Sequence, residues 1–198
     1  MPKLHLGCSG NVLGSRSADD PEKDWINIDA ACDPKWFLFH GATEVVAEGY
    51  TRLFQGDMTV LPMRNGFADE IFSEHSLEHL SPVQVTRALH EWWRVMRPGG
   101  KIRIIVPDLM GIAKKLIETD GDMLWSAGGE RTGDWEQGYT KLLVGIYGAD
   151  WEGPLSMHKT GFTPKYLTQC LEKAKFHSIK VEPIWNHEIF SIEAVGFK

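Results

Sequence analysis

The 198-residue chain has little cysteine, no basic cluster and no long apolar run. Its three cysteines are too scattered for a disulfide framework or a zinc-binding spacing, which favours a reducing compartment. The formal net charge is −6, so we expect no nucleic-acid partner. Since we find neither a membrane-spanning run nor a signal peptide, we expect a cytoplasmic protein with no membrane span.

The composition is that of an ordinary globular protein, with 42% hydrophobic and 24% charged residues. We predict one domain over residues 1–198. Strands are expected at residues 3–7, 25–29, 51–55, 69–73 and 101–106, and helices at residues 82–96, 110–118, 139–147 and 163–175, with a further possible helix over 35–49. The alternation of strands and helices predicts an α/β protein with a mainly parallel sheet.

Two segments depart from this alternation. Residues 179–184 and 188–197 suggest an antiparallel hairpin at the sheet edge, which adds one reversed strand. Residues 109–160 are rich in glycine and tryptophan and do not resemble a simple crossover, so we predict an inserted lid there. Three tryptophans in this insert could form a substrate wall or an interface within a homodimer: Trp125, Trp135 and Trp151.

The first strand breaks into glycines, and the second ends in an acid. The first break covers Gly7, Cys8, Ser9 and Gly10, and Asp29 follows Gly7 by 29 − 7 = 22 positions. Glycines at a strand end let a ligand approach the backbone closely, and an acid at this spacing suits the hydroxyls of a ribose. The pattern indicates a nucleoside-containing cofactor. The alternative is that the glycines serve only a tight turn and that Asp29 is a solvated residue at the end of a strand.

Further segments follow in a fixed order. They are Gly56-Asp57-Met58, the run from Phe67 to Leu80, and the run from Leu89 to Gly100. Together with the glycine motif and Asp29, this series resembles class I S-adenosylmethionine-dependent methyltransferases, in particular the small bacterial methyltransferase-domain group. The resemblance implies a Rossmann-like doubly wound fold: a mostly parallel seven-stranded sheet with an antiparallel C-terminal strand, in three α/β/α layers.

The resemblance also implies roles for individual residues. Residues 7–10 would hold the cofactor through backbone N–H groups, and Asp29 would bind both ribose hydroxyls. Asp57 would accept a hydrogen bond from the adenine amine, with Met58 packed on the ring. Ser73, Glu74 and His75 follow the fourth strand and would face the methyl-transfer site, although Ser73 could instead cap a helix.

Two departures from the family pattern support a different interpretation. His5 stands where most members have an acid that holds the methionine end of the cofactor, and Ser9 stands where a second glycine is usual. A catalytically degenerate binding or scaffold protein is therefore the alternative. A nicotinamide-dependent oxidoreductase is disfavoured, because Val12 occupies the last glycine position of G-x-G-x-x-G.

The segment His75-Ser76-Leu77-Glu78-His79 also fits the H-x-x-E-H pattern of zinc peptidases. That chemistry needs both histidines on one face of an α-helix, whereas this segment straddles a strand end. We therefore expect no metal, and expect Glu78 and His79 to anchor the following helix.

Taken together, these features predict a methyltransferase that uses S-adenosylmethionine to methylate a small molecule or a glycan. Methyl transfer from a sulfonium needs mainly alignment, and a base only where the acceptor must lose a proton. His75 and His158 are the candidate catalytic residues, because histidine titrates near neutrality. His158 lies at the end of the predicted lid.

Overall fold

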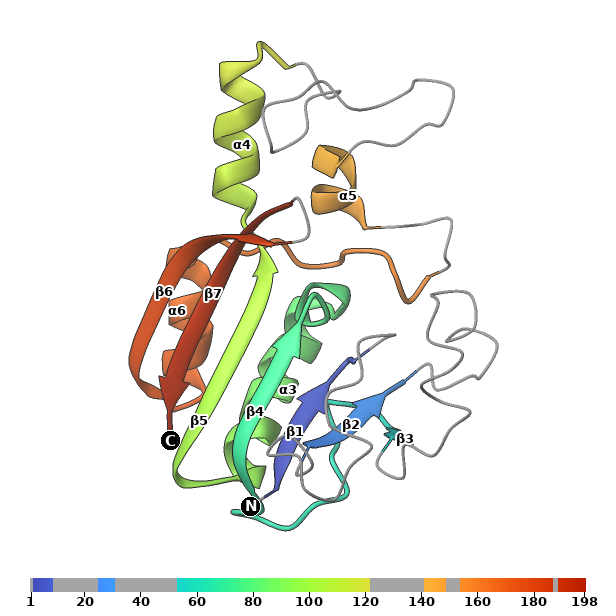
Figure 1. The fold of residues 1–198 in the computed structure, drawn as a ribbon, viewed down its shortest axis with the longest axis vertical. Helices are drawn as coiled ribbons and strands as arrows, with labels where there is room; N and C mark the ends of the chain where they lie inside the picture. The colour runs from blue at the N-terminus through green and yellow to red at the C-terminus, as the bar shows by residue number, and fades with distance from the viewer. Residues whose placement is uncertain (1, 9–24, 31–52, 122–140, 149–153, 187–188) are drawn as a thin grey trace, which may run out of the picture.

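The computed structural model describes residues 2–8, 25–30, 53–121, 141–148, 154–186 and 189–198. Their centre is a seven-stranded sheet in the order β3-β2-β1-β4-β5-β7-β6 (Figure 1). The strands are β1 (Lys3–Leu6), β2 (Trp25–Asp29), β3 (Leu53–Gln55), β4 (Ala68–Glu74), β5 (Met96–Pro107), β6 (His177–Asn186) and β7 (Ile189–Phe197). All neighbouring pairs from β3 to β5 are parallel, and β7 runs antiparallel to both of its neighbours. The predicted α/β class, the mostly parallel sheet and the reversed C-terminal strand are confirmed.

The described helices are α3 (Pro82–Val95), α4 (Leu109–Glu118), α5 (Lys141–Tyr147) and α6 (Pro164–Lys173), with a short 3-10 helix η1 (Leu77–His79). Figure 1 shows α3 and α6 behind the sheet, and α4 and α5 beyond the carboxyl end of β5. The predicted helix over 35–49 and the segment 11–24 lie outside the described residues, and so does most of the third layer that we predict.

Helix α3 illustrates how local sequence sets an element. The Ser81 hydroxyl accepts a hydrogen bond from Gln84 N, the Gln84 side-chain oxygen accepts one from Ser81 N, and Pro82 occupies the first turn. Val85, Leu89 and Trp92 lie at helical spacing and are fully buried in the main core. The capping box and the apolar stripe therefore begin and orient the helix that covers β1, β4 and β5.

Strand β5 begins earlier than the predicted residue 101. The helix ends at Val95 as the Arg97-Pro98-Gly99-Gly100 turn suggests, but Met96 already pairs with Ala68 across a register shift. Gly99 N also donates to Lys198 O at 2.8 Å, and Gly99 adopts a φ of 74°. The irregular start is held by strand partners that are distant in sequence, which the turn residues alone do not reveal.

His5 is a core residue on the second face of the sheet. It is 1% exposed and lies directly between Asn27 of β2 and Phe72 of β4 in the strand register. Its ring stacks on Phe72 at a centroid distance of 5.1 Å, and Nδ1 lies 3.2 Å from Asn27 Oδ1. Burial lowers the pKa of His5 from 6.5 to about 4, against smaller opposing effects of Asn27, Glu74 and Asp29. The side chain is therefore neutral at pH 7.

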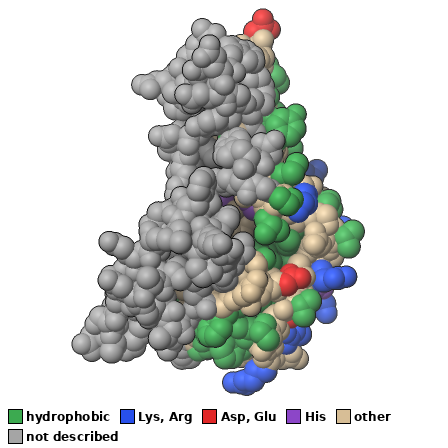
Figure 2. All heavy atoms as spheres, turned by 90° about the vertical axis from the view of Figure 1, so that its right-hand side faces the viewer, with side chains coloured by type: hydrophobic (Ala, Val, Ile, Leu, Met, Phe, Trp, Pro, Cys, Tyr) green, Lys and Arg blue, Asp and Glu red, His purple; other side chains and the backbone are tan. Residues whose placement is uncertain are grey.

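Among the described residues, no helix is long and apolar enough to cross a membrane. On the face shown in Figure 2, the hydrophobic side chains of the described residues are interspersed with charged ones.

The burial of His5 predicts a pH-dependent stability. Because the folded state resists protonation of His5, the unfolded chain binds the extra proton between about pH 6.5 and pH 4, and stability falls with falling pH in that window. We expect His5→Phe to reduce the loss of unfolding free energy between pH 7 and pH 4.5 by about 2 kcal/mol. Urea unfolding of both proteins at the two pH values measures this, with the exposed His90→Phe as control. Parallel pH dependence in wild type and His5→Phe would contradict it.

Candidate functional site

The predicted cofactor segments meet at the carboxyl ends of β1, β2 and β3. Gly7 N donates to Ile28 O at 2.8 Å, and Gly56 N donates to Asp29 O at 2.9 Å, so the three strand ends are tied in one row. Leu6 pairs with Ile28, which puts Gly7 and Asp29 beside each other at the sheet edge. The structure therefore brings Gly7, Asp29 and the 56–58 turn together; Ser9 and Gly10 lie outside the described residues.

Gly7 occupies a position that no larger residue fits. Its φ is 69°, and a Cβ atom there would lie 2.9 Å from Met58 Cε and closer still to the side chain of Ser76. The Ser76 hydroxyl in turn donates to Gly7 O at 2.6 Å. The glycine is therefore required by close packing between the β1 end, the β3 turn and the residues after β4. The neighbouring Cys8 is buried.

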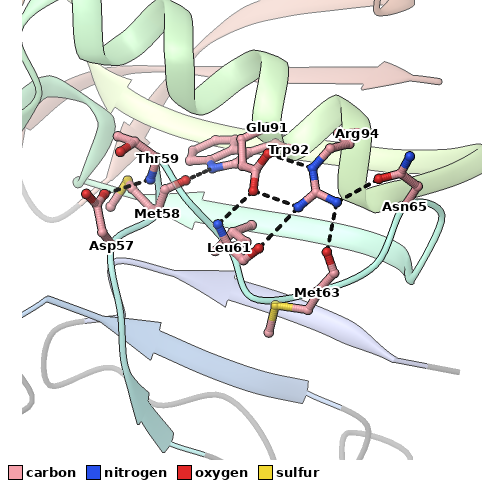
Figure 3. A network of polar contacts seen from close by, with 9 residues as sticks. All are labelled: Asp57, Met58, Thr59, Leu61, Met63, Asn65, Glu91, Trp92 and Arg94. Atoms are coloured by element: carbon pink, nitrogen blue, oxygen red, sulfur yellow. Dashed lines mark hydrogen bonds and ion pairs between the residues drawn. The ribbon is translucent and has the colours of Figure 1, made fainter.

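The 57–65 loop, which contains Asp57 and Met58, is held by its own backbone and by α3 (Figure 3). Thr59 N donates to Asp57 Oδ1 at 2.8 Å, and this turn leaves Oδ2 without a hydrogen-bond partner among the described residues. The indole Nε1 of Trp92 donates to Met58 O at 2.9 Å. The predicted adenine-side residues are thus fixed by a buried helix residue.

Glu91 and Arg94 of α3 hold the rest of the same loop. Leu61 N donates to Glu91 Oε1 at 2.7 Å, while the Arg94 guanidinium donates to Leu61 O and Met63 O. Arg94 also donates to both carboxylate oxygens of Glu91, and these hydrogen bonds, which outweigh partial burial, lower the pKa of Glu91. We call Glu91 and Arg94 the α3 clamp. The sequence does not predict this clamp, because an acid and a base three residues apart on a helix give no sign of loop partners about thirty residues away.

The end of β4 carries the residues predicted to face methyl transfer. Ser73 is fully buried, and its Oγ has no hydrogen-bond partner among the described residues. It therefore caps no described helix, and Ser81 caps α3 instead. Glu74 is half-buried. His75 N donates to Ile105 O at 2.9 Å, and His75 adopts a φ of 45°, a conformation that is uncommon for residues other than glycine.

Three histidines surround the buried carboxylate of Glu78, which is 1% exposed. His75 Nδ1 lies 3.3 Å and His158 Nε2 lies 3.9 Å from Glu78 Oε1. The rings of His79 and His158 meet edge to face at a centroid distance of 4.9 Å. We call Glu78, His75, His79 and His158 the histidine cluster. The H-x-x-E-H pattern thus marks residues that do come together, but on a 3-10 turn and not on the α-helix of a zinc peptidase.

His158 reaches the cluster because its segment is bonded to η1. Lys159 N and Thr160 N both donate to Glu78 O, at 2.8 and 3.1 Å. The Thr160 hydroxyl donates to Leu80 O at 2.6 Å. The end of the predicted lid is therefore fixed against the strand-to-helix turn. The tryptophans at 125, 135 and 151, and with them the basis for a homodimer, lie outside the described residues.

The electrostatics of the cluster favour a charged Glu78. Burial raises its pKa, but the contact with His75 and the charges of His79, His75 and His158 outweigh burial and lower it. Burial likewise lowers the pKa of His75, yet the contact with Glu78, its charge and that of Glu74 raise it overall. Burial lowers the pKa of His158, more than the charge of Glu78 raises it. A carboxylate and imidazoles of different basicity can move a proton or bind a cation.

The fold and the sequence both match known proteins. Residues 4–104, more than half of the chain, match the family model described as "Methyltransferase domain". No curated protein matches. Among solved structures, an S-adenosylmethionine-dependent methyltransferase from Methanosarcina mazei is 15% identical with a TM-score of 0.61, covering 100% of this chain and 92% of that one. One from Archaeoglobus fulgidus is 13% identical with a TM-score of 0.60, covering 100% and 86%.

A third structure carries the cofactor. Phosphoethanolamine N-methyltransferase 2 from Haemonchus contortus, in complex with S-adenosyl-L-methionine, is 13% identical with a TM-score of 0.62, covering 100% of this chain and 48% of that one. At such identities, the structural likeness establishes the fold, and the family match adds the class of protein. With the strand order, the row of strand ends and the family match in agreement, this chain belongs to the class I S-adenosylmethionine-dependent methyltransferases, whose cofactor is S-adenosylmethionine.

Proposed function

We propose that the protein transfers the methyl group of S-adenosylmethionine to a small molecule or a glycan. The observation that carries this proposal is the meeting of Gly7, Asp29 and the Asp57–Met58 turn in one row, with His75 at the end of the adjacent β4. The cofactor's adenosyl part would lie along the row, and its sulfonium would point toward β4.

Each residue of the row suits one part of the cofactor. Asp29, at the end of β2, would accept hydrogen bonds from both ribose hydroxyls through its two oxygens. Asp57 would accept from the adenine amine, since its Oδ2 is not used by the turn, and Met58 would pack on the ring. Residues 7–10 would offer backbone N–H groups to the methionine end of the cofactor.

The chemistry is an in-line displacement on an activated donor, so the chain supplies mainly alignment. Ser73 and Glu74 would line the cofactor side of the transfer site. His75 and His158 are the proposed catalytic residues, on the acceptor side: His75 would take the acceptor's proton, and His158 would act on the same acceptor group from across Glu78.

The acceptor class rests on two observations. The net charge of −6 disfavours nucleic acid. A structural neighbour, phosphoethanolamine N-methyltransferase 2, was solved with phosphomonomethylethanolamine and S-adenosylhomocysteine, which supports a small acceptor here.

The scattered cysteines support a cytoplasmic location.

The degenerate scaffold stays as the second candidate because of His5. Its side chain is packed between Asn27 and Phe72 and cannot replace the family acid that binds the methionine end. Cofactor bound to the purified protein, together with an open acceptor pocket, would argue against this candidate.

We expect isothermal titration to show binding of S-adenosylhomocysteine at one site per chain. Asp29→Ala should weaken it about tenfold or more, because a charged acceptor of two hydrogen bonds is lost. Glu172→Ala, an exposed acid on α6, is the control and should bind as wild type does. No heat at millimolar cofactor, or an unchanged affinity in Asp29→Ala, would count against the assignment.

The α3 clamp should act on cofactor affinity from a distance. We expect Glu91→Gln to weaken S-adenosylhomocysteine binding roughly three- to tenfold, because the 57–65 loop loses an ion pair that orders it. Glu172→Gln makes the same chemical change on α6 and should have no effect. Titration of both variants decides this, and equal affinities would show that the clamp serves stability alone.

His75 should affect transfer and leave cofactor binding unchanged. With an acceptor found by screening small molecules and glycans with tritiated donor, we expect His75→Ala to lower kcat about a hundredfold or more. Its S-adenosylhomocysteine affinity should match wild type, and the exposed His90→Ala should keep full kcat. A kcat of His75→Ala within a few-fold of wild type would mean that the reaction needs no base there.

A further inference from the structure

We propose that Glu78, His79 and His158 form a binding site for a divalent transition-metal ion such as Zn²⁺. The side-chain ligand atoms of these three residues all lie within 4.8 Å of one another. The sequence predicts no metal site, because the H-x-x-E-H pattern needs an α-helix to bring both histidines to one face. The structure offers a different set, in which Glu78 is a ligand and the distant His158 replaces His75.

The carboxylate of Glu78 is the first reason for this proposal. It is 1% exposed, and neither of its oxygens receives a hydrogen bond of good geometry from the described residues; Oε1 has ion-pair contacts with His75 Nδ1 at 3.3 Å and His158 Nε2 at 3.9 Å. Burying a carboxylate without well-formed hydrogen bonds is costly, and these contacts offset that cost only in part. A dication among these groups would satisfy the charge directly.

His158 has the orientation that a metal ligand requires. Its Nδ1 lies 3.2 Å from Gly145 O, so this nitrogen can donate to the carbonyl and carry the proton. The lone pair is then on Nε2, which points to Glu78 Oε1 at 3.9 Å. Metal-bound histidines usually donate their other ring nitrogen to a carbonyl or carboxylate in this way.

His79 has a backbone carbonyl on each side. Nδ1 lies 3.2 Å from Met157 O, and Nε2 lies 3.1 Å from His75 O. A neutral imidazole donates only one hydrogen bond. The lone pair of its other nitrogen therefore faces the lone pairs of a carbonyl oxygen, which is unfavourable. Binding an ion through that nitrogen would remove the clash of lone pairs and leave the other nitrogen to donate.

The donor set selects the kind of ion. Two imidazoles and one carboxylate are ligands found in catalytic zinc sites, where a fourth position stays open. Tetrahedral bonds of about 2 Å place ligand atoms roughly 3.3 Å apart, so closing the site needs shifts of about 1 Å. The hydrogen bonds of Lys159 and Thr160 to Glu78 O keep both halves of the site in place.

In the proposed function, His158 would act by holding the ion. This catalytic role of the ion rests on the proposed function. At the open position, the ion would bind the acceptor's oxygen or nitrogen and lower the pKa of that group. His75, whose Nδ1 lies 3.3 Å from Glu78 Oε1, is beside the ion and remains the side chain to receive the proton. Metal binding itself does not depend on the methyl transfer.

The test is the metal content and metal affinity of the purified full chain. After chelation and reloading, we expect one equivalent of Zn²⁺ by elemental analysis, visible d–d bands with Co²⁺, and a melting temperature that rises with Zn²⁺. Glu78→Gln and His158→Ala should each weaken Co²⁺ binding at least tenfold. His90→Ala removes an exposed histidine from α3 and should bind as wild type does. Because Glu78 is buried, circular dichroism checks the fold of its variant, and the more accessible His158 gives the result if Glu78→Gln does not fold.

Two results would overturn the proposal. One is a wild-type chain that shows no Co²⁺ bands and no melting shift at millimolar metal; the cluster would then be an ion-pair network around Glu78, with His79 held between two backbone carbonyls. The other is equal metal binding in wild type and His158→Ala, which would place the metal elsewhere. S-adenosylhomocysteine titration on the same samples is independent of both results. A chain that binds S-adenosylhomocysteine but no metal rejects only the metal site. A chain that binds metal but no S-adenosylhomocysteine rejects only the proposed function.

Discussion

The site depends on one close approach, between Gly7 at the end of β1 and Ser76 after β4. The Ser76 hydroxyl donates to Gly7 O, and the space that a Cβ at residue 7 would need is filled by Ser76 and Met58. This packing brings three segments to a single point: the glycine turn, the β3 turn and the start of η1. Any side chain at residue 7 would push these segments apart. The φ of 69° at this position is also unfavourable for residues other than glycine.

Two sets of hydrogen bonds extend outward from that point. On the cofactor side, Trp92 and the α3 clamp fix the loop of Asp57 and Met58. On the opposite side, the carbonyls of Glu78 and Leu80 fix Thr160 and its neighbours, which carry His158. Both sets bind loop backbone to the ends of α3 or to the turn before it. Helix α3, which fills the main core, therefore sets the geometry on the cofactor side of the proposed transfer point, and the turn that precedes it sets the geometry on the other side.

Buried polar groups concentrate around the same strand ends. Asp29 ends β2, while Ser73, Ser76 and Glu78 lie where β4 meets η1. Polar groups are expensive to bury, so their gathering at one place, together with the uncommon backbone of His75, is typical of a functional centre. The pattern fits the proposed function, in which backbone groups, Asp29 and Asp57 form the cofactor row and ionisable side chains form the acceptor side.

The sequence by itself determined the order of strands and helices, the reversed final strand, and the family. These depend on local signals: Pro82 marks the first turn of α3, and Gly7 and Asp29 mark the ends of β1 and β2, wherever the rest of the chain lies. It also marked His75, Glu78 and His79 as unusual. Only the tertiary structure decided that His158 joins them, that Ser73 caps no helix among the described residues, that His5 is a core residue and that Glu91 and Arg94 hold the 57–65 loop. Each of these depends on contacts between residues far apart in the chain, and such contacts exist only after the sheet has brought distant segments together.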